Sequence, residues 1–375
     1  MTFQVLGRCP ERFGRLLDAF VAEFKTGEEL GASFTLAIDG EVVVDMRAGH
    51  ADRARTRPFR RNTLAPLFSI TKIIAALMIA RLVDQGKLSY TQTVASIWPE
   101  FAQAGKAEIT VEQVLSHQAG LSGLDKPIDR ILWYDAPAIC ERLAAMEPLW
   151  PVGSASGYHP HTYGFLVGEI FRRVDGRSLG TAMREDLAIP LGLDLWIGLP
   201  DTEHRRCAEV AFWQKPGTLK STHRAVEYAL KAKWASPGGQ GLGAWRRGEF
   251  PGGNGLATGP ALARLLGALA CGGSLAGVHV LSPEAMDLMR AQRIVGRDLV
   301  LPHTVSWGAG VMRNAPYMHY GPSPDAFGHA GWGGCVAFAD PARGVSGAYL
   351  LNRHGPKAIG DERAIRLVAA AHDCL

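Results

Sequence analysis

The chain has 375 residues, of which 47% are hydrophobic and 20% are charged, a balance typical of a globular protein with a large core. The formal net charge is only +4, and the basic residues are scattered in pairs such as Arg60-Arg61 and Arg172-Arg173 rather than massed. These features give no support to nucleic-acid binding, and the length favours two structural lobes.

Cysteine usage and hydropathy narrow the class further. The six cysteines lie far apart and include no C-x-x-C pair, so we expect neither a disulfide framework nor a metal cage. The N-terminal segment lacks the apolar core and the cleavage site of a signal peptide. Lys72 and Arg81 bracket the most apolar stretch, which is too short for a membrane helix of roughly 18 residues. We expect a cytoplasmic enzyme with no membrane partner and no metal or organic cofactor.

The N-terminal region is predicted to form a helix followed by a hairpin. Between residues 11 and 25, apolar side chains recur at helical spacing. Two β-rich runs follow at residues 34–38 and 41–46, joined by Asp39-Gly40. An Asp-Gly pair between such runs is a strong hairpin signal.

The next predicted helix carries the first candidate chemistry, because Ser69 begins it and Lys72 follows on the same face. Side chains at this spacing lie roughly 5–6 Å apart at Cβ. Residues 73–80 are all apolar, and burial lowers the pKa of a lysine, which makes its amine a usable base for the serine. The tetrapeptide alone is weak evidence, since a lysine in an apolar helix usually extends its amine to water. We expect this helix to end near Gln85, before Gly86.

The middle of the chain is predicted to be mostly helical. Thr110 and Gln113 form a capping-box pattern at the start of one helix. Further helices are expected at 137–146, 161–174, 178–187 and 260–271, and from Ser282 onward. Residues 234–260 hold nine glycines, and a loop of this length in a compact domain is usually functional or mobile.

The C-terminal region returns to a β pattern. Residues 335–339 and 347–351 are predicted to form adjacent strands, and residues 361–370 a final helix. Strand patterns at both ends with helices between them predict an α/β (α+β) protein. One sheet would be assembled from the chain ends, with a helical lobe inserted in it.

Two other patterns compete as functional sites. A G-x-S-x-G match spans residues 176–180 and offers Ser178 as a rival nucleophile. A nucleophile elbow needs a buried strand before the serine, whereas residues 161–174 are predicted to be helical, so we interpret the match as a turn between helices. His159 and His161 lack an H-E-x-x-H pattern and an acidic partner at metal spacing, so zinc binding is not predicted.

Two later stretches support Ser69. One is the turn Trp150–Tyr158, which delivers a tyrosine into a following helix, and the other is the Gly-rich segment Gly328–Gly334. The ordered set of S-x-x-K, a tyrosine about ninety positions later and H-x-G near the C-terminus resembles the serine β-lactamase and penicillin-binding-protein superfamily. Within it, the chain is most similar to the carboxylesterases of β-lactamase fold (family VIII esterases), and the similarity covers nearly the whole chain.

The resemblance implies a β-lactamase-like fold, in which N- and C-terminal helices flank an antiparallel sheet. Its α/β domain would comprise residues 1–75, 156–184 and 299–375. Its mainly helical domain would comprise residues 76–155 and 185–298.

The resemblance also implies roles for individual residues. Ser69 would be the nucleophile, and Lys72 would lower its proton affinity. Tyr158 would be a low-pKa phenol that accepts the serine proton and passes it to the leaving alcohol. The backbone N–H groups of Ser69 and Trp332 would form the oxyanion hole.

Two departures from the family pattern bear on the substrate. Penicillin-active relatives tend to have Y-x-N, where this chain has Pro160 in third place, and K-T-G, where it has His329 in first place. Binding of a substrate's side-chain amide and binding of its carboxylate are therefore both weakened, which favours neutral esters over β-lactams or D-peptides. The predicted substrate-binding residues are a histidine, glycines that allow close backbone approach and tryptophans, namely Trp133, Trp234, His329, Gly331, Trp332 and Gly333.

We therefore predict a serine carboxylesterase that hydrolyses small short-acyl esters through an acyl-enzyme intermediate, with a small-molecule ester as its partner. The alternatives are a weak β-lactamase or amide (D-peptide) hydrolase, and a non-catalytic binding or scaffold protein of the same fold. The scaffold alternative predicts a damaged motif, whereas Ser69, Lys72 and Tyr158 are all present.

Overall fold

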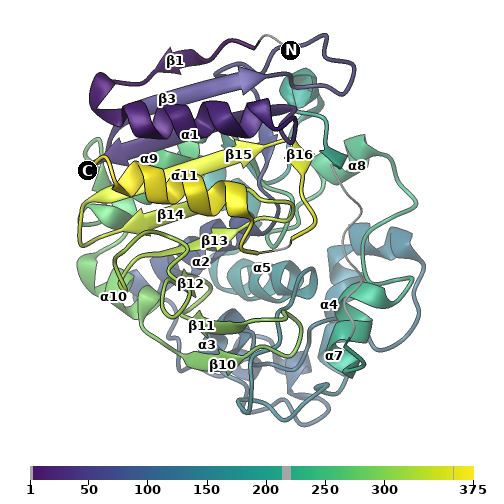
Figure 1. Ribbon diagram of the computed structural model, residues 1–375. Coiled ribbons are helices and arrows are strands. Elements are labelled where there is room, and N and C mark those ends of the chain that lie inside the picture. Colours follow the sequence, from purple (N-terminus) through teal and green to yellow (C-terminus); the bar gives the residue numbers. More distant parts are fainter. Residues whose placement is uncertain (1–2, 213–220, 358) are drawn as a thin grey trace.

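A nine-stranded sheet forms the frame of the molecule (Figure 1). The computed structural model describes residues 3–212, 221–357 and 359–375. The strand order is β1-β3-β2-β15-β14-β13-β12-β11-β10, and every pairing is antiparallel. Its strands are β1 (Leu6–Arg8), β2 (Gly31–Ile38), β3 (Glu41–Gly49), β10 (Ile294–Arg297), β11 (Thr304–Trp307), β12 (Met312–Arg313), β13 (Phe327–Ala330), β14 (Val336–Asp340) and β15 (Val345–Leu351). The sheet is therefore assembled from both ends of the chain, as predicted.

The predicted hairpin is confirmed as β2 and β3. Asp39 and Gly40 connect the two strands with φ of 51° and 78°, the positive values that a two-residue hairpin turn of type I′ requires. β15 pairs with β2, with Ala32 opposite Leu351, which ties the last long strand directly to the N-terminal hairpin.

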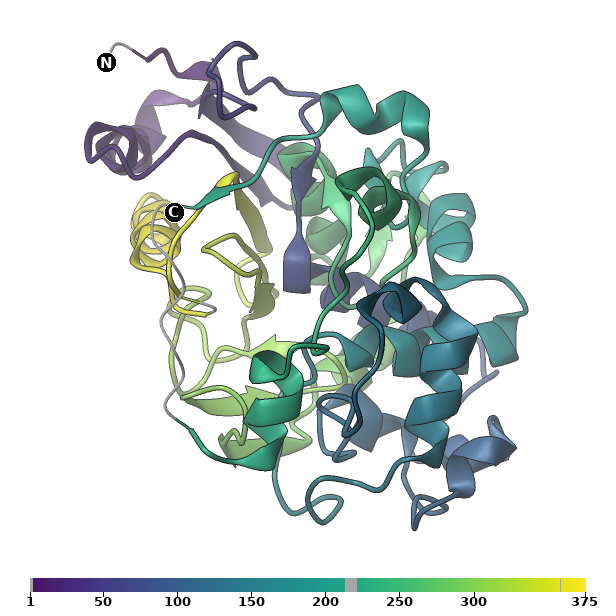
Figure 2. The same ribbon diagram turned by 90° about the vertical axis from the view of Figure 1, so that its right-hand side faces the viewer.

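Helices cover both faces of the sheet. α1 (Gly14–Lys25) and α11 (Glu362–His372) lie side by side on one face, as both views show (Figures 1 and 2). α9 (Gly259–Ala270) packs on the other face against β2 and β15. The two chain ends thus build one layer together.

α2 (Thr71–Asp84) is largely buried, with eleven of its fourteen residues buried. It contacts α5, α6, α10 and β13. The other helices are α3 (Val111–Leu115), α4 (Ala136–Ala145), α5 (Thr162–Asp175), α6 (Leu179–Met183), α7 (Arg224–Val226), α8 (Leu242–Arg247) and α10 (Pro283–Arg290). Short strands complete the fold, namely β4 (Ala65–Pro66), β5 (Leu195–Trp196), β6 (Ala211–Phe212), β7 (Leu256–Ala257), β8 (Ser274–Leu275), β9 (Val278–His279) and β16 (Arg353–His354).

Side-chain caps define several helix starts. Thr110, Thr258 and Ser282 each accept a hydrogen bond from the backbone N–H three residues further on, which confirms the predicted starts. Within the described residues, no helix combines the length and the apolar character needed to cross a bilayer.

The structure differs from the sequence-based expectation in two respects. The sequence pattern does not predict β10 to β13, because these strands are two to four residues long and are defined by pairing with their neighbours. α9 packs on the sheet although the predicted division places it in the helical domain, and one continuous core runs through both predicted domains. The division stays a prediction, and residues 1–2, 213–220 and 358 within it lie outside the described residues.

Candidate active site

A strained turn places Ser69 at the entrance of α2. The turn is the short 3-10 helix η2 (Phe68–Ile70), and Phe68 has a φ of 47°, which is uncommon for a residue with a Cβ atom. Thr71 Oγ1 donates to Phe68 O at 2.5 Å and accepts from the Gly255 N–H at 2.9 Å. A side chain and a neighbouring segment therefore hold the turn in place.

Lys72 lies one helical turn after Ser69 and is fully buried. Its Nζ contacts Gly252 O at 2.7 Å, Pro160 O at 3.0 Å and Ser69 Oγ at 3.3 Å. Because of this burial, with no carboxylate among the three contacts, the pKa of Lys72 lies well below its ordinary value. A neutral amine has two N–H donors, which match the two carbonyls, and one lone pair, which is then available to the Ser69 hydroxyl.

Tyr158 is the second side chain, beside Lys72, that contacts the hydroxyl of Ser69. Its hydroxyl donates to Ser69 Oγ at 2.5 Å, and Lys72 Nζ lies 4.8 Å from the centre of its ring. The Asp298 carboxylate fixes the backbone at this point, since it accepts from the Tyr158 N–H at 2.9 Å and from Ser156 Oγ at 2.8 Å. The structure brings Ser69 and Tyr158 together although they are 89 positions apart.

The protonation of Tyr158 differs from the expectation. Burial raises the pKa of Tyr158 above its ordinary value, and the hydrogen bond with Ser69 offsets this only in part. The prediction of a low-pKa phenol is wrong, because desolvation in this site penalises the phenolate. The phenol keeps its proton, and the amine of Lys72, whose pKa burial lowers, lies within reach of Ser69.

Buried histidines pack around Tyr158 in the neutral form. Burial lowers the pKa of His159 and of His329 to about 3, and it lowers the pKa of His117 as well. The ring of His117 lies 5.0 Å from that of Tyr158, and its φ of 63° is unusual for a non-glycine residue. These imidazoles shape the site without adding charge to it.

The Gly-rich segment approaches Ser69 from the end of β13. A Cβ atom on Gly331 would lie 2.5 Å from Leu67 O, so only glycine allows this approach. The backbone N–H groups of Ser69 and Trp332 donate to no acceptor in the part of the chain that the structure describes. Both donors are therefore available to a bound molecule.

Ser69 and Tyr158 lie in the wall of a cavity of about 810 Å³. Among its described lining residues, two are lysines, Lys231 and Lys357, and none is acidic. Aromatic side chains from four distant segments also line it, namely Phe68, Phe212, Trp245 and Trp332. The cavity is therefore mainly apolar, with positive charge on its lining.

Of the predicted substrate-binding residues, Trp332 lies among the described residues of the cavity wall and the others do not. His329 is fully buried, and its Nδ1 lies 2.7 Å from a neighbouring carbonyl. Trp133 is also fully buried, and its Nε1 donates to Trp234 O at 2.8 Å. The two tryptophans connect segments of the helical region, and the glycines on either side of Trp332 shape the loop.

Several residues of the site are not predicted from the sequence. Pro160 and Gly252 act through backbone carbonyls, which no side-chain pattern reveals. Phe212 and Ile359 reach the cavity from segments that carry no motif. The glycine-rich stretch 234–260 is predicted to be functional or mobile, but this signal does not single out Gly252.

Ser178, the rival nucleophile, caps α6. Its Oγ accepts from the Thr181 N–H at 3.2 Å and donates to Glu249 Oε1 at 2.8 Å. α5 ends at Asp175, and the next residue, Gly176, has a φ of 91°. The interpretation of the G-x-S-x-G match as a turn between helices is confirmed.

The sheet, its helical layers and the Ser69 site define a class of protein, and comparison with known families identifies it. The chain belongs to the beta-lactamase family, whose model matches residues 16–371. It is a hydrolase of the serine β-lactamase fold. The predicted superfamily and fold class are thereby confirmed.

Three similar proteins show where in this family the chain lies. A penicillin-binding-protein homologue from Caulobacter crescentus is 57% identical and has a TM-score of 0.97 over 99% of this chain and 100% of that chain. A family VIII carboxylesterase is 40% identical, with a TM-score of 0.92 over 99% of this chain and 100% of that chain. The esterase/beta-lactamase LipL of Mycobacterium tuberculosis is 35% identical over 93% of this chain and 83% of its own length.

Proposed function

We propose that the protein is a serine carboxylesterase that forms an acyl-enzyme on Ser69. A serine hydroxyl is unreactive by itself and needs a base within hydrogen-bond reach. The observation that carries the proposal is the double contact of Ser69 Oγ, with the Tyr158 hydroxyl at 2.5 Å and with Lys72 Nζ at 3.3 Å, beside a large apolar cavity.

Acylation would start from neutral Lys72. The amine takes the hydroxyl proton of Ser69 as Oγ forms a bond to the ester carbonyl carbon, and the carbonyl oxygen becomes negative. The N–H groups of Ser69 and Trp332 donate to that oxygen, and losing one such donor typically costs roughly 3–4 kcal/mol. When the ester C–O bond breaks, Tyr158 gives its proton to the leaving alcohol oxygen and regains one from the Lys72 ammonium.

Deacylation would use the same groups in a second cycle. A water molecule enters where the alcohol left, and Tyr158 with Lys72 removes one of its protons as its oxygen bonds to the acyl carbon. The bond to Ser69 Oγ then breaks, and the Lys72 ammonium gives that proton, directly or through the Tyr158 hydroxyl, to the oxygen of Ser69. Because burial lowers the pKa of Lys72, the amine returns to its neutral form between turnovers.

The cavity favours neutral or anionic esters over cationic ones. Its volume of about 810 Å³ lies within the range of pockets that hold drug-sized ligands. Lys231 supplies positive charge, Lys357 is paired with Glu362 outside the lining, and no carboxylate is found among the described lining residues. With the expected short acyl group next to Ser69, most of this volume would receive the alcohol part of the ester.

A β-lactamase or amide hydrolase is the second candidate. The similarity to a protein described as an esterase/beta-lactamase and to a penicillin-binding-protein homologue favours it. Against it stand Pro160, which has no side-chain amide, and His329, which is buried and neutral. We therefore rank ester hydrolysis first.

Covalent labelling tests the nucleophile. After incubation with a fluorophosphonate, peptide mass mapping should find the label on Ser69. Ser69→Ala should lose both the label and ester turnover while the circular dichroism spectrum stays unchanged, because the two side chains differ little in volume. A label on Ser178, or an unlabelled protein, would refute the proposal.

Substrate preference separates the two candidates. Hydrolysis of 4-nitrophenyl acetate should be faster than that of a chromogenic cephalosporin at equal concentration. Faster cephalosporin turnover that also depends on Ser69 would favour the second candidate.

A further inference from the structure

Arg363, near the start of α11, is a buried guanidinium with partners on several elements. Its side chain is only 3% exposed. Nε donates to Asp361 Oδ1 at 2.9 Å, Nη2 to Asp361 Oδ2 at 3.0 Å, and Nη1 to Glu29 Oε1 at 2.8 Å. These two carboxylates pair with the positive charge of the guanidinium. The remaining contacts go to backbone carbonyls.

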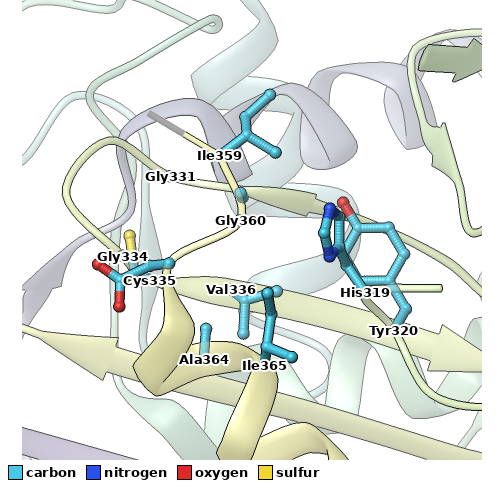
Figure 3. A pocket seen from close by; sticks show the side chains of 12 residues that line it. His319, Tyr320, Gly331, Gly334, Cys335, Val336, Ile359, Gly360, Ala364 and Ile365 are labelled. Atoms are coloured by element: carbon cyan, nitrogen blue, oxygen red, sulfur yellow. The ribbon is translucent and has the colours of Figure 1, made fainter. Parts of the chain in front are cut away.

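One of these carbonyls belongs to the Gly-rich loop of the candidate active site. Arg363 Nη2 donates to Gly333 O at 2.8 Å, and the Gly355 N–H donates to the same oxygen at 2.9 Å. The packing is close, since a Cβ atom on Gly334 would lie 2.7 Å from Arg363 Nη2. Figure 3 shows Gly331 and Gly334 of this loop beside residues of α11.

The contact reaches Trp332 through two peptide planes. Gly333 O and the Gly334 N–H belong to one planar peptide, so holding the oxygen orients the N–H. The Gly334 N–H donates to Gly331 O at 3.3 Å. Gly331 O in turn shares a peptide plane with the Trp332 N–H, which points the opposite way. Arg363 thus fixes the direction of the Trp332 N–H.

We propose that Arg363 is a positioning residue for the oxyanion hole, acting through Gly333 and Gly334 on the Trp332 N–H. The inference rests on the proposed function, which assigns that N–H to the developing oxyanion. An arginine suits this task because its planar guanidinium presents several donors in a fixed arrangement, so carboxylates and a loop carbonyl are bound at once. A lysine keeps the charge but has no such fixed arrangement.

The test compares Arg363→Lys with the matched control Arg366→Lys. Arg366 lies on the same helix, pairs with Glu23 at 2.7 Å and is 52% exposed, away from the loop. With 4-nitrophenyl acetate, R363K should lower kcat at least about ten-fold with KM within about two-fold, because the misplaced donor acts only in the transition state. The rate of fluorophosphonate labelling at Ser69 should fall in parallel. R366K should match the wild type in all three measurements.

A folded R363K variant with wild-type kcat and labelling rate would overturn the proposal. So would a parallel loss of kcat in R366K, because the effect would then belong to the helix as a whole. If R363K does not fold, Asp361→Asn replaces it, since asparagine still caps α11 but no longer binds the guanidinium as an anion. D361N should also lower kcat at constant KM, and unchanged kcat would overturn the proposal.

The design separates this inference from the function on which it rests. If wild-type Ser69 is not labelled and esters are not hydrolysed, the proposed function fails. If wild-type Ser69 is labelled and R363K behaves like wild type, the positioning role alone fails.

Discussion

Burial controls the chemistry of Lys72. A lysine on an apolar helix normally extends its amine to water, which leaves it charged. Here the amine stays inside and meets two backbone carbonyls, those of Pro160 and Gly252. Desolvation disfavours the ammonium, and the carbonyls satisfy both N–H groups of the neutral form. The result is an amine that loses its proton at a lower pH than an exposed lysine does.

We predict that kcat/KM rises with pH along the titration of Lys72 and reaches its plateau well below pH 10.5, the ordinary pKa of a lysine. The deprotonated amine is the active form, and because burial lowers its pKa, that form dominates at a lower pH than in an exposed lysine. Lys72→Arg stays protonated and should lose about 10²- to 10⁴-fold in kcat. A pH–rate profile of both proteins checks this; wild-type activity in K72R would contradict it.

We also predict that Tyr158 stays protonated throughout the neutral range, because burial raises its pKa above 10.0. A near-ultraviolet difference titration of wild type against Tyr158→Phe should show no tyrosinate from Tyr158 below pH 10.0. The phenylalanine ring can keep its stacking on Trp307, 5.9 Å away, but has no proton to give. Y158F should therefore lose about 10²-fold or more in kcat with little change in Tm. A tyrosinate band at neutral pH would instead support the low-pKa phenol predicted from the sequence.

At the scale of elements, the site is a junction of η2, α2 and the segment before β7. The strained φ of Phe68 persists because Thr71 Oγ1 bonds both to Phe68 O and to the Gly255 N–H. Strained backbone of this kind needs surrounding contacts that define it more strongly than its own preference does. The serine is thus presented by a turn that distant residues hold.

We predict that Thr71→Val lowers both stability and kcat. Valine has nearly the same shape but makes neither hydrogen bond, which leaves the buried Gly255 N–H without its partner at a cost of about 1–3 kcal/mol. Thr258→Val is the matched control, since it removes the cap of α9 at a cost of about 1 kcal/mol without touching η2. Urea unfolding and ester turnover should show a stability loss in both variants and a loss of kcat in T71V only. Equal kcat in the two variants would contradict this.

At the scale of the whole molecule, a buried polar cluster joins the chain ends. Glu29, which precedes β2, accepts hydrogen bonds from Tyr349 on β15 and from Arg363 on α11. The same guanidinium holds the loop of Trp332 through Gly333 O. The packing of the two termini is therefore continuous with the geometry of the candidate active site.

We predict a pH-dependent contribution of Glu29 to stability. Burial raises the pKa of Glu29 from 4.5 to about 7, although Arg363 opposes the rise. The native state therefore binds this proton more tightly than the unfolded chain. The stabilising contribution is complete below pH 4.5 and is lost as the pH rises through about 7. Glu29→Gln resembles the protonated form of Glu29 and should remove this loss of stability with rising pH. Urea unfolding of both proteins across this pH range checks the sign, and equal slopes would contradict it.

The sequence alone determined the features that depend on neighbours along the chain. The hairpin at Asp39-Gly40 and the caps at Thr110, Thr258 and Ser282 follow from backbone preferences and side-chain contacts a few residues apart. The S-x-x-K pair likewise needs only one helical turn. Together with the order of the later motifs, these local signals were enough to identify the family.

Only the tertiary structure decided how the site is charged and held. The carbonyls that fix Lys72 come from residues 88 and 180 positions away, and they act through the backbone rather than through side chains that a pattern could reveal. The protonation of Tyr158 and the role proposed for Arg363 depend on desolvation and on peptide planes packed together from distant segments. Desolvation and packing are properties of the assembled interior, and for that reason a local sequence pattern does not contain them.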